Sequence, residues 1–120
     1  MSPPTILIVE DEALIALELE DHFRGQGYEV AVASTIGSAI VRIEQGGIGL
    51  CVLDYHLGDL PCTPVAEALR AHRVPFVICS GSPAGFLEDL FAGVPVITKP
   101  FDEQVLETIV AATLNHPTVN

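Results

Sequence analysis

Three carboxylates stand side by side at Glu10, Asp11 and Glu12, directly after the apolar run TILIV (5–9). Like charges repel one another, and a charge removed from water costs several kcal/mol. Either water screens this cluster or a positive group occupies it. The chain carries a net charge of −11 and a single lysine, Lys99, so the position of that lysine matters.

Other polar side chains follow other apolar runs. Asp54 follows the third run, Ser80 the fourth and Lys99 the fifth. Taken singly, these are an ordinary turn aspartate, a Ser-Gly turn and a solvated lysine. If the runs form parallel strands, however, their carboxyl ends meet at one edge of the sheet, where such folds bind ligands. Unrelated coincidences explain this gathering poorly.

The chemistry that suits this set is phosphoryl transfer assisted by a divalent cation. Carboxylates bind Mg²⁺, which keeps several waters and readily takes a phosphate oxygen, and Mn²⁺ is an alternative ion. A neighbouring carboxylate can attack phosphorus and form an acyl phosphate. The ion and a lysine ammonium then neutralise the equatorial oxygens, and a hydroxyl supplies one more hydrogen bond.

The elements that position these residues alternate along the chain. Apolar runs of strand length occupy residues 5–9, 28–32, 49–53, 75–79 and 94–98. Stretches with helical periodicity occupy residues 12–24, 35–45, 63–72, 83–91 and 102–114, and Asp102 is a good N-cap for the last. This alternation predicts an α/β fold: a flavodoxin-like, doubly wound, five-stranded parallel sheet in the order 2-1-3-4-5, with helices on both faces.

Composition limits the classes of function. A chain of 120 residues predicts one domain spanning 1–120, with a core at about 5–114. The acidic charge disfavours nucleic-acid binding. No apolar run approaches the roughly 18 residues of a membrane span, and the first residues lack signal-peptide features, so we expect no membrane partner and a cytoplasmic chain. The three cysteines are expected to be buried, reduced thiols.

The motifs together resemble the receiver (CheY-like) domain of two-component response regulators. The segments that carry the resemblance are VEDE (9–12), LDYHL (53–57), CSG (79–81) and TKPF (98–101). It covers about residues 5 to 114. The ordered set is highly specific, although each motif alone is weak.

The resemblance implies a role for each acidic residue. Asp54 is the expected phosphoacceptor and also a metal ligand. Asp11 is expected to bind Mg²⁺ directly and Glu10 through water, while the backbone carbonyl of His56 provides a third protein ligand. Glu12 is not expected to be a ligand and belongs to the first helical turn.

The resemblance also assigns the remaining polar residues. Ser80 matches the switch hydroxyl that turns toward the phosphoryl group, and Lys99 matches the lysine that pairs with it. Val96 departs from the family, which commonly carries Tyr or Phe there. The short helix at 83–91 is a second departure, because only 18 residues (81–98) separate Ser80 from Lys99.

The expected function is a phosphoacceptor response regulator, not an enzyme beyond its own phosphorylation and dephosphorylation. Its phosphodonor would be a histidine kinase or a histidine phosphotransfer protein. The sequence also resembles stand-alone alphaproteobacterial receivers that are associated with HWE/HisKA2-type kinases, although those carry Phe-Ala-Thr-Gly where this chain has Ile78-Cys79-Ser80-Gly81. A downstream protein partner, a phosphate-sink role, a homodimer and an origin in a longer protein all stay open.

Two alternatives from other classes also stay open. One is a pseudo-receiver that binds partners without phosphorylation. The other is a small Mg²⁺-dependent phosphohydrolase with an aspartyl-phosphate intermediate, although His56 stands where a second acid/base aspartate would be needed. A dinucleotide-binding module is disfavoured because no GxGxxG follows the first run.

Overall fold

The computed structural model describes residues 4–81, 93–99 and 101–115. The helix predicted at 83–91 lies outside the described residues. Among those residues no helix is long and apolar enough to cross a membrane. The three cysteines are buried free thiols, as predicted.

A parallel sheet forms the centre of the molecule. Its five strands are β1 (Thr5–Val9), β2 (Glu29–Ala33), β3 (Ile48–Asp54), β6 (Phe76–Ser80) and β7 (Val96–Thr98). Their order is β2-β1-β3-β6-β7, and every neighbouring pair is parallel. This is the predicted 2-1-3-4-5 order, so the fold class is confirmed.

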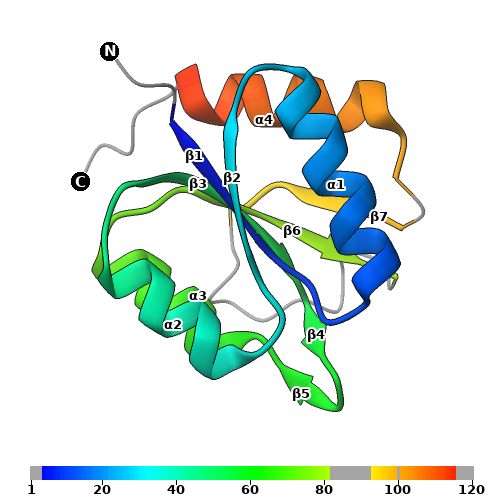
Figure 1. Cartoon of the computed structure of the whole chain (residues 1–120). Helices are drawn as coiled ribbons and strands as arrows, with labels where there is room; N and C mark the ends of the chain where they lie inside the picture. Colours follow the sequence, from blue (N-terminus) through cyan, green and yellow to red (C-terminus); the bar gives the residue numbers. More distant parts are fainter. Residues whose placement is uncertain (1–3, 82–92, 100, 116–120) are drawn as a thin grey trace.

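Helices cover both faces of the sheet (Figure 1). They are α1 (Ala13–Gly25), α2 (Ile36–Glu44), α3 (Thr63–Ala71) and α4 (Glu103–Asn115). In Figure 1, α1 and α4 lie on one face and α2 and α3 on the other. Each face therefore has its own hydrophobic layer, as expected for a doubly wound fold.

Alternate residues of each strand supply the two layers, as the period of two along a strand requires. In β1, Ile6 and Ile8 pack with Phe23 of α1 and the apolar side of α4. Leu7 and Val9 point the other way and join the layer under α2 and α3. These four of the five β1 residues are fully buried, which explains why this strand reads as a continuous apolar run.

Prolines explain why two strands begin later than predicted. The fifth strand begins at Val96 rather than at residue 94, and the fourth begins at Phe76 rather than at residue 75. Pro95 and Pro75 have no N–H to donate to the ladder. Each still contributes its carbonyl, which accepts from Ile78 N–H and Cys51 N–H respectively. The other predicted boundaries of the described elements differ by at most one residue.

A small hairpin after β3 was not predicted. Its strands are β4 (His56–Leu57) and β5 (Leu60–Pro61), which pair antiparallel. The chain reverses at Gly58, whose φ of 66° lies in the left-handed region that favours glycine. Strands of two residues are too short to show alternation, which is why the sequence pattern missed them.

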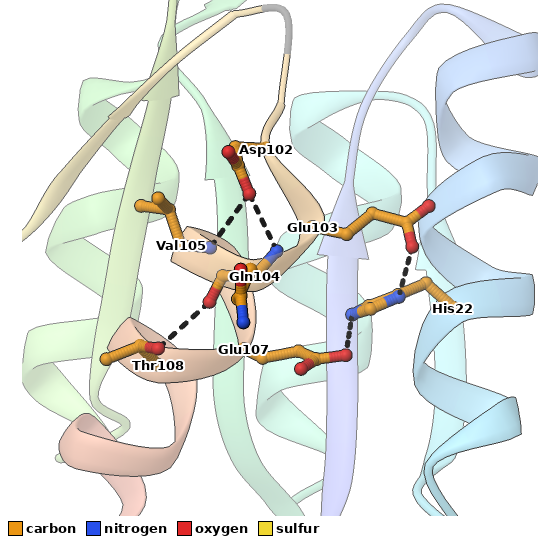
Figure 2. Close-up of polar contacts among 7 residues, drawn as sticks. All are labelled: His22, Asp102, Glu103, Gln104, Val105, Glu107 and Thr108. Carbon is orange, nitrogen blue, oxygen red and sulfur yellow. Dashed lines mark hydrogen bonds and ion pairs between the residues drawn. The ribbon is translucent and has the colours of Figure 1, made fainter.

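The start of α4 is fixed by the predicted N-cap residue. One oxygen of the Asp102 carboxylate accepts hydrogen bonds from the backbone N–H groups of Gln104 at 2.9 Å and Val105 at 3.2 Å (Figure 2). These bonds satisfy two of the donors that a helix leaves free at its amino end.

Candidate phosphoacceptor site

Two neighbouring strands bring the predicted carboxylates together. Glu10 and Asp11 follow β1, and Asp54 is the last residue of β3. Because Val9 pairs with Leu53, the residues that follow this pair in the two strands of the ladder, Glu10 and Asp54, emerge side by side. Carboxylate oxygens of Glu10, Asp11 and Asp54 lie within 4.8 Å of one another. The predicted acidic residues therefore converge at the carboxyl edge of the sheet.

Glu12 does not join this cluster. It is the N-cap of α1 and is exposed, and its backbone N–H donates to Glu10 Oε2 at 3.2 Å. The run of three acids thus divides into a pair directed into the site and one residue at the start of a helix, as the sequence predicted.

Lys99 neutralises part of this charge. Its Nζ lies 2.9 Å from Glu10 Oε1 and 3.2 Å from Asp54 Oδ1. The Lys99 backbone N–H also donates to the Ser80 carbonyl at 2.9 Å, which extends the β6–β7 ladder beyond Thr98. The single lysine of the chain is thus held by its backbone at the site and by its side chain against two carboxylates.

The burial of these groups is uneven. Glu10 is 2% exposed and Asp54 is 8% exposed, whereas Asp11 is exposed. Burial and, next, the hydrogen bond and charge of the neighbouring Asp54 together raise the pKa of Glu10 to about 7, against the opposing effect of the Lys99 ammonium. For Lys99, burial acts to lower the pKa, but the hydrogen bond to Glu10 and the charge of Asp54 outweigh burial and raise it.

The exposed carboxylate is held by a residue that the sequence analysis did not select. The backbone N–H of Gly58 donates to Asp11 Oδ2 at 2.8 Å. Burial acts to raise the pKa of Asp11, but this hydrogen bond and the charge of Lys99 are among the contacts that lower it. The glycine of HLGD, shortly after Asp54, was the available signal for a turn reaching back to the site.

The donor set fits a hard divalent ion. Three converging carboxylates against one ammonium leave excess negative charge, and carboxylate oxygens are the ligands that Mg²⁺ prefers. Glu10 and Asp54 are buried, whereas Asp11 is exposed. The cluster is therefore open to solvent on the side of Asp11, where a phosphate oxygen could approach.

The remaining predicted residues lie on the elements beside Asp54. Ser80 is buried at the end of β6, where it pairs with Thr98. His56 is exposed at the start of β4, and its ring packs edge-on against Tyr55 with ring centroids 4.6 Å apart. Val96 is half-buried and pairs with Ile78. The roles expected of Ser80 and His56 stay predictions.

Comparison with known proteins agrees with this arrangement. Residues 6–111 match the family model described as the response regulator receiver domain. The chain is 32% identical over 118 residues to the phyllosphere-induced regulator PhyR of Methylorubrum extorquens, covering 91% of this chain and 43% of that protein. It is 29% identical over 116 residues to the sensory transduction protein RegX3 of Mycolicibacterium smegmatis, covering 92% and 50%. It thus spans about half the length of these curated relatives.

Solved structures give the same result. The solution structure of SdrG from Sphingomonas melonis Fr1 is 39% identical, with a TM-score of 0.81, over 95% of this chain and 98% of that one. A response regulator receiver protein from Sinorhizobium medicae is 27% identical, with a TM-score of 0.83, over 97% and 98%. The fold, the motifs and the match over residues 6–111 together establish that this chain belongs to the response regulator receiver domain family of two-component systems.

Proposed function

We propose that this receiver accepts a phosphoryl group on Asp54 in the presence of Mg²⁺. The observation that carries the proposal is the convergence of the Glu10, Asp11 and Asp54 carboxylates within 4.8 Å, with Lys99 Nζ 3.2 Å from Asp54. Three acids and one ammonium leave negative charge for a divalent ion to balance, and receiver domains typically bind Mg²⁺.

Each residue has a distinct part in the proposed transfer. Asp11, Asp54 and the His56 backbone carbonyl would hold the ion directly, and Glu10 through water. When bound, the ion supplies neutralisation of the charge on the transferred group. A carboxylate oxygen of Asp54 attacks phosphorus, an O–P bond forms, and the P–N bond of a donor phosphohistidine breaks. The imidazole nitrogen of the donor keeps the electron pair of the broken bond and takes up a proton from water, so the histidine leaves in its neutral form.

Lys99 lies close enough to Asp54 to pair with the negative charge of a phosphoryl group on that residue. Its ammonium contacts both Glu10 and Asp54, so it can pair with a new phosphoryl oxygen while Glu10 retains it. We expect the Ser80 hydroxyl to turn toward that group. Because residue 96 is a valine, this movement of Ser80 would take place without the aromatic side chain that receivers commonly carry at that position.

The proposed partners follow from the family. Receiver domains interact with histidine kinases or phosphotransfer proteins. We propose that this chain is cytoplasmic and that its donor is a histidine kinase of the HWE/HisKA2 type or a histidine phosphotransfer protein. The output would pass to a protein partner or, as a phosphate sink, back to a phosphorelay. The pseudo-receiver and the phosphohydrolase are the competing functions.

The test is incubation with acetyl phosphate and Mg²⁺ followed by intact-mass measurement. We expect one phosphoryl adduct on the wild type, none without Mg²⁺ and none on Asp54→Asn. Asp59→Asn is the matched control, because Asp59 is an exposed aspartate of the hairpin turn, and it should be phosphorylated normally. No adduct on the wild type would favour the pseudo-receiver, and repeated turnover of phosphomonoesters would favour the phosphohydrolase.

A further inference from the structure

The strand β2 forms one edge of the sheet, and among the described residues no strand pairs with its outer side. The Ala33 carbonyl faces β1, because it accepts from the Glu10 N–H at 3.0 Å. Successive residues of a strand direct their backbone groups to opposite sides, so those of Val30 and Val32 face outward. The Arg24 guanidinium agrees with this direction, since it donates to the Val30 carbonyl from outside at 3.4 Å.

Apolar side chains flank this outer edge on both faces of the sheet. β2 lies between α1 and α2 (Figure 1). Val32 lines two hollows, one together with Leu17 of α1 and the other with Val41 of α2. These three residues are half of the six large apolar residues that the described chain exposes. Exposed apolar residues that gather in one place mark an interaction surface.

The strand has little of the protection that sheet edges usually carry. Lysine, proline and bulges commonly keep edge strands from pairing with other strands. β2 reads EVAVA, pairs with β1 without a bulge and carries one charge, at Glu29. Arg24 covers the Val30 carbonyl only through a long bond from an exposed side chain, which can move away. The edge is therefore suited to pairing with another strand.

The charges at the two ends of this edge favour a second copy of the chain as the partner. Glu10 and Asp11 lie at the carboxyl edge of the sheet. Arg24 and Arg42 lie in the last turns of α1 and α2, which end at the amino edge. If two copies of β2 run antiparallel, the acidic end of each copy lies beside the basic end of the other. A parallel arrangement would bring like charges together in a chain of net charge −11.

We propose that two copies of this chain form a dimer by antiparallel pairing of their β2 strands around a two-fold axis at Ala31. Val30 of each copy then lies opposite Val32 of the other, and their outward N–H and C=O groups exchange two hydrogen bonds in each pair. Both valines lie on the face of the sheet that α1 covers, so they also pack across the axis. The dimer does not depend on phosphorylation of Asp54.

The same register brings opposite charges of α1 together. Glu20 lines the hollow beside Val32, and Arg24 reaches Val30. Because Val30 lies opposite Val32 of the second copy, Arg24 of each copy comes near Glu20 of the other. Within one copy these two side chains already form an ion pair at 2.9 Å. The dimer would thus gather two acids and two bases around its axis, a self-complementary arrangement.

Sedimentation equilibrium of the full chain at an ionic strength of about 0.15 M tests the association. We expect a reversible monomer–dimer equilibrium with a dissociation constant on the order of 0.1 mM, because two short strands make a small, transient interface. At about 1 mM chain, about one fifth of the copies then stay monomeric. Hydrogen exchange of the outward Val30 and Val32 N–H groups should therefore slow about fivefold between dilute and concentrated samples, while that of Ala31, which faces β1, should change little.

Val32→Lys tests the edge directly. A lysine at the pairing edge should weaken the dimer about tenfold or more. The melting temperature should stay close to that of the wild type, because Val32 is 44% exposed. Val105→Lys is the matched control, since Val105 is 47% exposed on α4 and is not among the described residues that line the two hollows. It should form the dimer like the wild type.

A pair of charge reversals tests the register and decides the matter if Val32→Lys melts lower. Glu20→Arg and Arg24→Glu each bring like charges together across the axis, so each variant alone should associate about tenfold more weakly. Mixed in equal amounts, the two variants should form a heterodimer with about wild-type affinity, because every charge again meets its opposite. A mixture that associates no better than its components would overturn the proposal.

Other results would also contradict this interface. A chain that stays monomeric up to about 1 mM would overturn the proposal and leave the edge of β2 for a strand of another protein. A dimer that Val105→Lys breaks and a folded Val32→Lys does not would place the contact on α4. A dimer in which the exchange of the Val30 and Val32 N–H groups is unchanged would place it away from β2.

Discussion

Two groups of carboxylates in this molecule surround a basic side chain, and they are built differently. At the proposed phosphoacceptor site, oxygens of Glu10, Asp11 and Asp54 converge within 4.8 Å. Between α1 and α4, His22 lies between Glu103 and Glu107 (Figure 2). Glu103 Oε2 is 3.5 Å from Nδ1 and Glu107 Oε1 is 3.6 Å from Nε2, so the imidazole ring separates the two acids.

Burial and origin also differ between the two groups. The site residues lie at the carboxyl ends of two strands, β1 and β3, and become neighbours through the parallel register, and two of them are buried. Glu103 and Glu107 are one turn apart on α4, and their side chains are 66% and 43% exposed. Convergence of buried carboxylates creates a need for a cation, whereas two acids on opposite sides of a histidine ring are kept apart and are screened by water.

The largest expected difference between the groups is the effect of Mg²⁺. An ion that binds only the folded state stabilises it by about 2.7 kcal/mol at a concentration 100 times its dissociation constant. We expect a stabilisation of this order for the wild type and for Glu107→Gln, measured by chemical denaturation with and without Mg²⁺. Asp11→Asn should lose most of it. Glu12→Gln should keep this stabilisation. If Glu12→Gln loses as much of it as Asp11→Asn, then Glu12 belongs to the metal site and the separation of Glu12 from Glu10 and Asp11 is wrong.

A smaller effect is expected from pH in metal-free buffer. The pKa of Glu10 is about 7 in the folded protein, against an ordinary value of 4.5, so the folded state binds this proton more tightly. The resulting stability is fully present below pH 4.5 and is lost as the pH rises through about 7. We expect this loss to be about 2 kcal/mol, below the limit set by about 1.4 kcal/mol per pKa unit.

Denaturant unfolding at several pH values tests this prediction. Glu10→Gln should flatten the decline between pH 5 and pH 8, and Glu107→Gln should leave it in place. Identical slopes for the wild type and Glu10→Gln would show that Glu10 is not the group responsible.

Gly58→Ala should have a smaller effect on stability. An added Cβ at Gly58 would meet open space, so the cost comes from its positive φ and is about 1 kcal/mol. Because the Gly58 N–H holds Asp11, Mg²⁺ affinity should also fall. Gly37→Ala, at a helical position with open space and no positive φ, should be neutral or stabilising. If Gly58→Ala changes neither the stability nor the Mg²⁺ affinity, the hairpin does not contribute to the site.

The smallest effect belongs to the group around His22. Replacing Glu107 by Gln should change the free energy of unfolding by less than about 1 kcal/mol, because exposed ion pairs contribute little and are screened by salt. Its phosphorylation with acetyl phosphate should match that of the wild type. A large loss of either would mean that this group is coupled to the phosphoacceptor site.

The sequence predicted which residues gather at the carboxyl edge of the sheet better than it predicted their surroundings, for a physical reason. Strands such as TILIV show themselves by continuous apolar residues, and parallel strands must place Glu10, Asp54 and Lys99 at one edge. The hairpin that brings Gly58 to Asp11 has strands of two residues, which carry no readable period. The contact of His22 with α4 depends on how two helices pack, which local spacing does not specify.

The most direct measurement locates the phosphoryl group on the chain. Phosphorylated protein is treated with borohydride, which reduces an acyl phosphate, and the changed residue is identified by tandem mass spectrometry. We predict reduction at Asp54 alone when phosphorylation is carried out with Mg²⁺, and at no residue when Mg²⁺ is chelated. Modification of Glu10, Asp11 or an exposed acid in place of Asp54 would contradict the role proposed for the site.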